Sequence, residues 1–336
     1  MTIGELFYSD PTRQLEEVQK VTDYDQLETD VREFHETDSA ERVLTELGDI
    51  VRIHPNHDPR FLYIEATFGS GKTHLLKLVG LVVDDESEFD HLGERLAEKW
   101  TGFDNLARAV DESHVDRLKP VFLNLLDRDA SKEPPLPFLI YEAIGRELGY
   151  PTDPNWLLEW AWRLDMEYDE IWQALKEYTH DGKTFEEVLE EKAFLRTWLY
   201  EALPSMSETT GTDLDTTEGV KASIDAAESD VEPEAFDAGE LVQRIETVTE
   251  ALNVGSKQTE LLLGLDEVAL FVGDSQKRYR EFCNAEIVSA CGEQFATFLF
   301  FDFTERIKEG SRDGIFCGRT GFGYGSGWRE RHPGCS

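Results

Sequence analysis

Cysteine is scarce in this chain of 336 residues: none occurs before Cys283, and the four present all lie in the last sixty residues. Their spacing matches neither a zinc site nor a redox pair, so free thiols are expected. No segment approaches the ~18 consecutive apolar residues of a membrane span. The first residues also lack the basic and apolar regions of a secretory signal. These absences predict a cytoplasmic protein that does not associate with membranes.

Basic residues are also in short supply. The chain has 33 Lys and Arg against 70 Asp and Glu, which gives a net charge of −37 and a pI of about 4.4. A general basic footprint for nucleic acid is therefore absent, and any association with DNA is expected to be local or indirect. The acids are spread along the chain, which favours a halophilic source whose salty cytosol screens them, over a merely acidic protein.

Residues 61–80 carry the most informative pattern. A short apolar run, 61–64, enters a glycine-rich turn, and Gly71-Lys72-Thr73 then opens a segment with helical apolar spacing. Strand, glycine-rich loop, Gly-Lys-Thr and helix in this order predict a phosphate-binding P-loop, although Ala66 replaces its usual first glycine. The alternative is a chance Gly-Lys-Thr in a glycine-rich loop. The residues expected to bind ATP are Ala66, Thr67, Phe68, Gly69, Ser70, Gly71, Lys72, Thr73 and His74.

A second pattern lies nearly two hundred residues later. The apolar run 259–265 ends in Asp266-Glu267. In P-loop ATPases an aspartate at the end of such a strand supports Mg²⁺ together with the P-loop hydroxyl, here that of Thr73. An adjacent glutamate can polarise the attacking water, so Glu267 and Lys72 are the predicted catalytic residues. The alternative is an apolar strand that happens to end in two acids.

These patterns predict an α/β fold: the parallel sheet of a P-loop NTPase, of the type with an additional strand and a catalytic glutamate. A buried parallel strand is expected at 121–126, between the two motifs in sequence. We predict a helical N-terminal lead-in over 1–60 and an ATPase core over 61–282. Within the core we expect a helical insertion at about 152–203 and a flexible acidic linker at about 204–237, rich in Ser, Thr, Asp and Glu.

Residues 283–336 form an atypical tail. From Lys277 onward the chain has nine basic and eight acidic residues, whereas the rest is strongly acidic. One hypothesis is that the reading frame shifts soon after Phe282. The alternative is a native glycine-rich basic tail that contacts a partner or nucleic acid. Sequencing the gene separates the two, because an intact frame with related proteins sharing the tail contradicts the first.

Over residues 1–282 the chain resembles the N-terminal part of the large P-loop ATPase of BREX phage-defence systems, called BrxC or PglY. The resemblance rests on four stretches, 3–7, 68–77, 121–127 with 147–150, and 265–268 with 271–273. It implies binding and hydrolysis of ATP with Mg²⁺ inside a multi-protein, DNA-associated phage-resistance complex. Members of that family are generally much longer. The chain is therefore expected to be truncated, without the later strands and sensor residues.

Three functions are consistent with these patterns. The first is an ATPase, which could form a homo-oligomer and take an arginine finger from a neighbouring subunit. The second is a nucleotide-binding switch or scaffold without turnover, or a non-functional fragment of a longer ATPase. The third, a small-molecule kinase, fits less well, because such enzymes usually lack a long insertion between their motifs.

Overall fold

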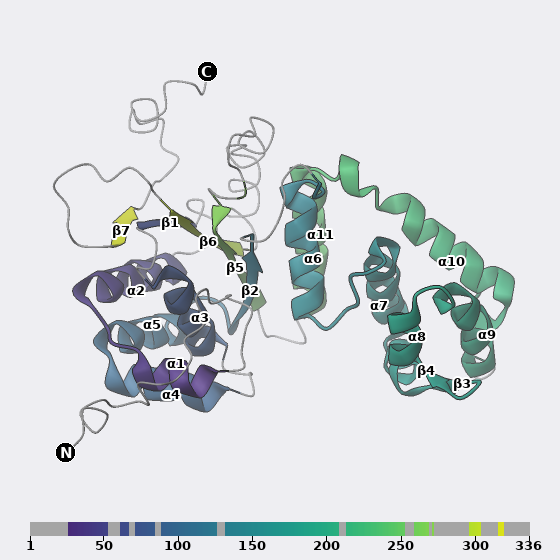
Figure 1. Cartoon of the computed structure of the whole chain (residues 1–336), viewed down its shortest axis with the longest axis horizontal. Helices are drawn as coiled ribbons and strands as arrows, with labels where there is room; N and C mark the ends of the chain where they lie inside the picture. Colours follow the sequence, from purple (N-terminus) through teal and green to yellow (C-terminus); the bar gives the residue numbers. More distant parts are fainter. Residues whose placement is uncertain are drawn as a thin grey trace, which may run out of the picture.

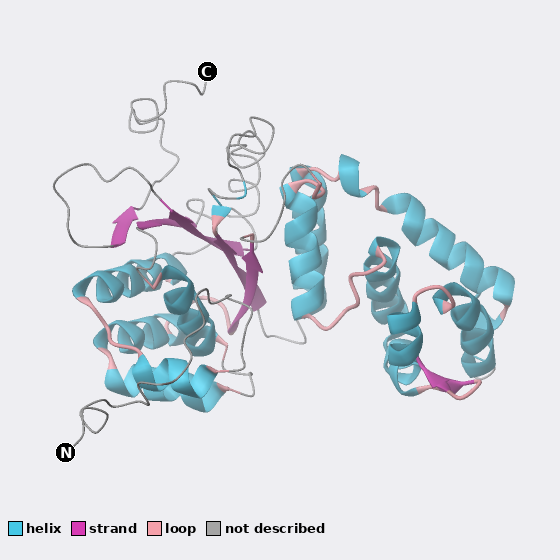
Figure 2. Cartoon of the chain, in the orientation of Figure 1, coloured by secondary structure: helices cyan, strands magenta, loops and turns pink. Residues whose placement is uncertain are grey.

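The computed structural model describes residues 26–52, 61–66, 71–84, 89–125, 132–207, 213–252, 259–268, 271, 296–303 and 315–318. It shows an α/β protein in which helices predominate around one five-stranded, mostly parallel sheet (Figures 1 and 2). The strands of this sheet are β1 (Phe61–Ala66), β2 (Arg117–Asn124), β5 (Thr259–Asp266), β6 (Ala296–Phe303) and β7 (Ile315–Gly318).

The order of the strands across the sheet is β2-β5-β6-β1-β7. The first four run parallel, and β7 pairs antiparallel with the outer side of β1. Because β1, β5 and β6 are parallel neighbours, their carboxyl ends meet at one edge of the sheet. This edge is where the two sequence motifs come together.

Helices α1 to α5 cover one face of the sheet (Figure 1). They share a core with Leu62 and Ile64 of β1, Phe122 of β2 and Leu262 of β5. Gly93 of α4 allows this layer to pack closely, because a Cβ there would lie 2.1 Å from the Leu81 carbonyl oxygen of α3. The bounds are α1 Leu27–Glu33, α2 Asp38–Val51, α3 Lys72–Val83, α4 Asp90–Lys99 and α5 Thr101–Asp111.

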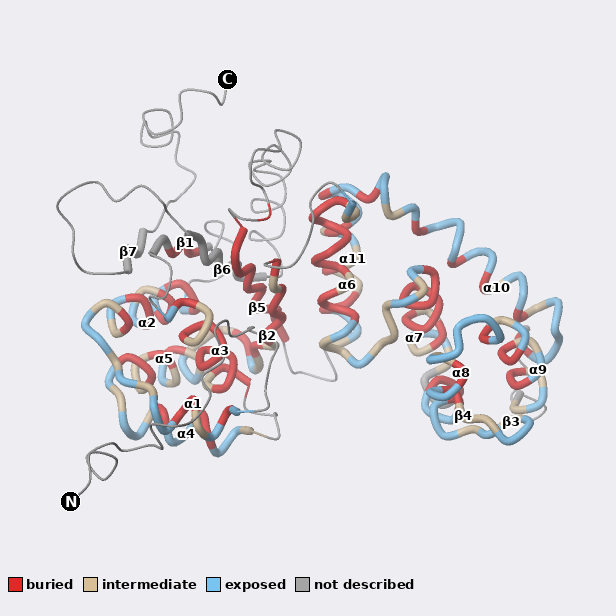
Figure 3. The backbone as a smooth tube through the Cα atoms, in the orientation of Figure 1, coloured by how far each residue is buried: buried red, intermediate tan, exposed pale blue. Residues whose placement is uncertain are grey.

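Helices α6 (Leu136–Glu147) and α11 (Ala238–Leu252) cover the opposite face. Leu261, Leu263 and Leu265 of β5 pack into this second core, whereas Leu262 packs into the first. Every residue of β5 is buried, as Figure 3 shows. A strand that is covered on both faces has a continuous run of apolar residues. The apolar run 259–265 is the pattern from which this strand was predicted.

The predicted helical insertion corresponds to a separate bundle, which lies between α6 and α11 in sequence and to one side of both helices in Figure 1. It contains α7 (Asn155–Glu177), α8 (Phe185–Glu191), α9 (Leu195–Ser207) and the hairpin of β3 (Thr179–His180) and β4 (Lys183–Thr184). Its tryptophans at 156, 160, 172 and 198 are buried in one cluster. In the part of the chain that the structure describes, none of the helices combines the length and apolar character needed to cross a bilayer.

The flexible linker expected at 204–237 is wrong for residues 213–237. Thr217–Asp230 forms helix α10, and short 3₁₀ turns lie at Asp213–Asp215 and Pro233–Ala235. Val220, Ile224 and Ala227 are buried against the insertion. These three apolar residues follow helical spacing, which indicates an amphipathic helix. The acidic composition of the segment as a whole indicated a flexible linker instead.

The expectation that later strands are lacking is wrong for 296–303 and 315–318. Strand β6 inserts between β1 and β5 and pairs with both, while β2, predicted between the motifs in sequence, lies at the sheet edge. The run 297–301 is rich in Phe and Leu, which favours a strand. The frame-shift hypothesis stays a prediction for gene sequencing. Residues 319–336 lie outside the described part, as do 1–25 and 53–60 of the helical lead-in.

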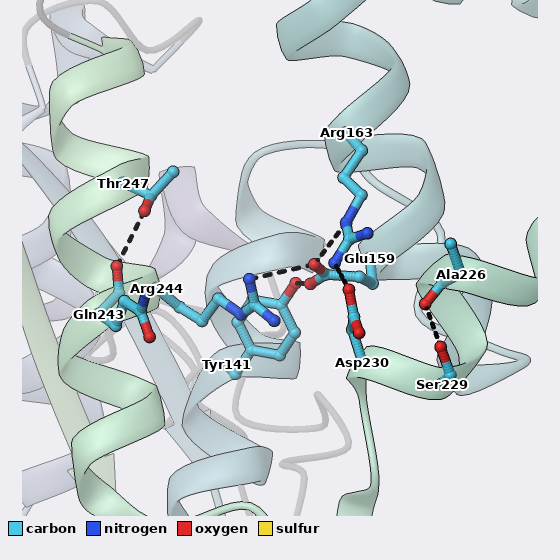
Figure 4. Close-up of polar contacts among 9 residues, drawn as sticks. All are labelled: Tyr141, Glu159, Arg163, Ala226, Ser229, Asp230, Gln243, Arg244 and Thr247. Atoms are coloured by element: carbon cyan, nitrogen blue, oxygen red, sulfur yellow. Dashed lines mark hydrogen bonds and ion pairs between the residues drawn. The ribbon is translucent and has the colours of Figure 1, made fainter. Parts of the chain in front are cut away.

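One buried polar network joins the insertion to the sheet layer (Figure 4). Its centre is Glu159 of α7, whose side chain is 0 % exposed. Glu159 accepts a hydrogen bond from the Tyr141 hydroxyl of α6 at 2.7 Å and pairs with Arg244 of α11 at 3.0 Å. Arg163 pairs with Glu159 at 2.8 Å and with Asp230 of α10 at 2.6 Å. Burial, followed by the Glu159 charge, raises the pKa of Tyr141, which keeps its hydroxyl a donor.

Candidate functional site

Strands β1 and β5 deliver the two motifs to the same edge of the sheet. Ala66 is the last residue of β1 and pairs with Phe303 of β6, and Asp266 ends β5 and pairs with Phe301. Since β6 lies between them, β1 and β5 each lie about 4.8 Å from β6, which puts their ends about 10 Å apart. Ligands of open α/β sheets bind outside such carboxyl ends.

The first turn of α3 follows the predicted phosphate loop. Gly71 caps this helix with φ of +83°, a left-handed conformation that glycine adopts without a steric penalty. Lys72 and Thr73 are the first two residues of α3, and the Lys72 side chain is 4 % exposed. The N–H groups of a helix start lack intrahelical acceptors and carry partial positive charge, so this turn favours an anion.

One contact joins the two motifs across 193 residues of sequence. The Thr73 hydroxyl donates a hydrogen bond of 2.7 Å to Oδ2 of Asp266. Asp266 is 1 % exposed, and its second oxygen, Oδ1, is buried without a hydrogen-bond partner among the residues that the structure describes. A hydroxyl and a carboxylate thus lie together at the start of α3.

The electrostatics at Asp266 reflect this burial. Desolvation raises the pKa of the Asp266 carboxyl above its ordinary value of 3.8. The Thr73 hydroxyl, the Lys72 charge and the backbone N–H of Glu267 oppose this rise without cancelling it. A divalent cation would add the positive charge that the buried carboxylate lacks.

Glu267 is the next residue and is held in an unusual conformation. The φ of Glu267 is +61°, and the residue is 7 % exposed. The Glu267 carbonyl accepts a hydrogen bond from the Phe271 N–H at 3.2 Å. A non-glycine residue in the left-handed region costs roughly 1–3 kcal/mol, and such strain clusters at functional sites. The turn therefore changes the chain direction just after the Asp266 side chain.

The residues present fit a hard divalent cation such as Mg²⁺. The Thr73 hydroxyl and the Asp266 carboxylate supply oxygen ligands, which Mg²⁺ prefers, and Oδ1 of Asp266 has unused acceptor capacity among the described residues. Of the predicted loop, Thr67, Phe68, Gly69 and Ser70 lie outside the described residues, and only the backbone of Ala66 is described.

His74, also predicted to contact the nucleotide, follows Thr73 in α3. Burial lowers the pKa of its imidazole, and its ring packs edge-on against Phe34 with centroids 5.6 Å apart. Phe34 and the connection between α1 and α2 around it carry no motif in the sequence that predicts a place near this site. No local signal could have found them, because their proximity to α3 depends on packing between helices forty residues apart.

Comparison with protein-family models, with curated proteins and with solved structures gives no match to this chain.

The raised pKa of Asp266 gives a prediction about stability. Below pH 3.8 the carboxyl is protonated in both the folded and the unfolded chain. As pH rises from there through the raised folded pKa, the unfolded chain ionises first, so the folded chain loses stability. Asp266→Asn escapes this loss. Without metal or nucleotide, the variant should therefore gain unfolding free energy relative to wild type across this interval.

Denaturant unfolding at a series of pH values checks this prediction. Asp225→Asn on the exposed side of α10 is the matched control and should show no such rise. A difference between Asp266→Asn and wild type that is independent of pH contradicts the prediction.

Proposed function

We propose that this chain binds Mg²⁺–ATP at the start of α3 and hydrolyses it. The observation that carries the proposal is the hydrogen bond between Thr73 and Asp266. It brings the Gly-Lys-Thr motif and the strand-terminal acid pair into one site, as the chemistry of phosphoryl transfer in P-loop enzymes requires. Two chance motifs would have no reason to meet at one edge of the sheet.

The strand order supports the same proposal. A strand, β6, separates the strand before the glycine-rich turn from the strand that ends in Asp266-Glu267. This arrangement agrees with the P-loop NTPase type that has an additional strand and a catalytic glutamate. The left-handed Gly71, with the helix start behind it, supports an anion-binding turn.

The residues would divide the work as follows. Lys72 would neutralise charge on the β- and γ-phosphates, and the backbone of the loop 67–71 would surround them. Glu267 would orient water and accept its proton for attack on the γ-phosphorus. Thr73 and Asp266 would hold Mg²⁺, and the bound ion would supply positive charge that offsets the negative charge of the phosphates.

The resemblance to the BREX ATPase family is the ground for the wider setting that we propose. The chain would act with other subunits of a cytoplasmic phage-defence complex, with indirect DNA association and an arginine finger from a neighbouring copy. A non-hydrolysing switch remains the second candidate, because the same residues could bind a nucleotide without hydrolysing it.

The test is ATP binding and phosphate release by the full chain with Mg²⁺. Wild type should do both, and Lys72→Ala should weaken ATP binding by about tenfold or more, since it removes a charge-assisted contact of roughly 1.5–3 kcal/mol. Lys221→Ala on exposed α10 is the matched control. Failure of wild type to bind ATP, or unchanged binding by Lys72→Ala, contradicts the proposal. Binding without phosphate release supports the switch.

A further inference from the structure

A pocket of about 170 Å³ lies between the first turn of α3 and the connection from α1 to α2. Its lining includes Phe34, His35, Thr37, Ala40, His74 and Leu75. Gly71, which caps α3, also borders it. The pocket is therefore adjacent to the proposed phosphate site. Its lining residues belong to the described ranges 26–52 and 71–84.

One wall of this pocket is aromatic and firmly supported. Phe34 packs edge-on against Trp100 with centroids 6.2 Å apart, and His35 lies against the same indole at 5.0 Å. Directly after His35 along the connection, the Glu36 carboxylate accepts a hydrogen bond of 3.0 Å from the Gly102 N–H at the start of α5. These contacts hold the connection in place, so the wall is preorganised.

The α3 side of the pocket is held as firmly. Lys77 of α3 forms a buried ion pair of 2.8 Å with Asp30 of α1, with side chains 2 % and 5 % exposed. This pair sits one helical turn from His74 and anchors α1 against α3. Ala40 and Leu75, which also line the pocket, are buried apolar residues.

The size and lining limit what the pocket could take. Pockets for whole drug-sized ligands are roughly 300–1,000 Å³, so this one suits a single ring system. Aromatic side chains stack on the π-faces of nucleobases, which is how proteins bind bases without relying on hydrogen-bond readout. A purine offers the largest stacking surface among the nucleobases.

We propose that this pocket binds the purine base of the nucleotide, between the aromatic wall of Phe34 and His35 and the first turn of α3. The proposal rests on the proposed function, since it assumes that the phosphates lie on the N-terminal turn of the same helix. Gly71 and His74 border both places, so one nucleotide could reach from the helix start into the pocket. The assignment makes the α1–α2 connection part of the nucleotide site.

The test compares two probes on the full chain with Mg²⁺: ATP and inorganic tripolyphosphate, which lacks a base. Calorimetry should show tighter binding of ATP by wild type. His35→Ala and Phe34→Leu should weaken ATP binding by about five- to hundredfold, the range that one stacking contact supplies. Tripolyphosphate affinity should not change. His91→Ala, on the exposed face of α4, is the matched control and should leave both affinities unchanged.

The outcomes separate this proposal from the one on which it rests. If wild type binds tripolyphosphate as tightly as ATP, or if both variants keep full ATP affinity, the base pocket is wrong and the phosphate site stands. If a variant loses both ligands equally, it acts by disturbing α3, and the base assignment is again wrong. Because His35 is exposed, its truncation tests the proposal even if Phe34→Leu unfolds the connection. If wild type binds neither probe, both proposals fail.

Discussion

Glu267→Gln is expected to lower the rate of phosphate release by about 10²–10⁴-fold, the usual contribution of a general base. The amide keeps the size and most of the hydrogen-bonding capacity of the carboxylate but cannot accept a proton from water. ATP affinity should stay within about twofold of wild type, because Lys72, Thr73 and Asp266 are untouched. Single-turnover phosphate release together with equilibrium ATP binding measures both quantities.

The position of Glu267 is what makes this effect large. It follows directly on Asp266, and its φ of +61° turns the chain just past the carboxylate that contacts Thr73. Glu112→Gln is the matched control, since that side chain is 63 % exposed and pairs with Arg52 on the surface. Unchanged phosphate release by Glu267→Gln would remove the residue from catalysis. Loss of ATP binding as well would instead assign it a role in holding the nucleotide.

Glu159→Ala should destabilise the fold by about 3–5 kcal/mol, the usual cost of removing one partner from a buried ion pair. The carboxylate is fully buried and serves Tyr141, Arg163 and Arg244 at once. Its loss leaves two guanidinium groups and a buried hydroxyl with fewer acceptors. Since these groups come from α6, α7 and α11, the damage falls on the junction between the insertion and the sheet layer (Figure 4).

Urea unfolding of the full chain checks this value. Glu167→Ala is the matched control, because Glu167 lies on the same helix α7 and is exposed. An exposed substitution of this kind should change the unfolding free energy by no more than about 0.5 kcal/mol. If both variants cost the same, the network around Glu159 does not stabilise the junction. Glu159→Gln should fall between the two, since it keeps the acceptor for Tyr141 but loses the charge.

Much of the core could be predicted from local patterns. The turn at Gly71 and the helix after it follow from glycine, Gly-Lys-Thr and helical apolar spacing, and α3 begins at Lys72. The apolar run ending at Asp266 predicts a strand, and the structure has β5 there, buried throughout. These elements are determined by neighbouring residues, so periodicity and turn chemistry are sufficient.

Other elements were not predicted, because their sequence signal was weak or because they depend on residues far apart in the chain. Helix α10 lies in a segment whose acidic composition indicated disorder. Burial of three apolar side chains, Val220, Ile224 and Ala227, stabilises the helix against the insertion despite this composition. Strand β6 lies in the near-neutral segment that follows Lys277, and its aromatic run there was not predicted as a strand. Its place between β1 and β5 depends on pairing with strands far apart in sequence, which local propensity does not encode.

The sequence by itself determined which residues are candidates for the proposed nucleotide site, because their types and spacing match that chemistry. These residues are Gly71, Lys72, Thr73, Asp266 and Glu267. Only the tertiary structure decided that Thr73 meets Asp266, and that Phe34 and His35 line a pocket with Gly71 and His74 of the α3 start. The physical reason is that a helix start or a strand end is specified within a few residues. The distance between two such ends depends instead on the order of strands and on how helices pack over them.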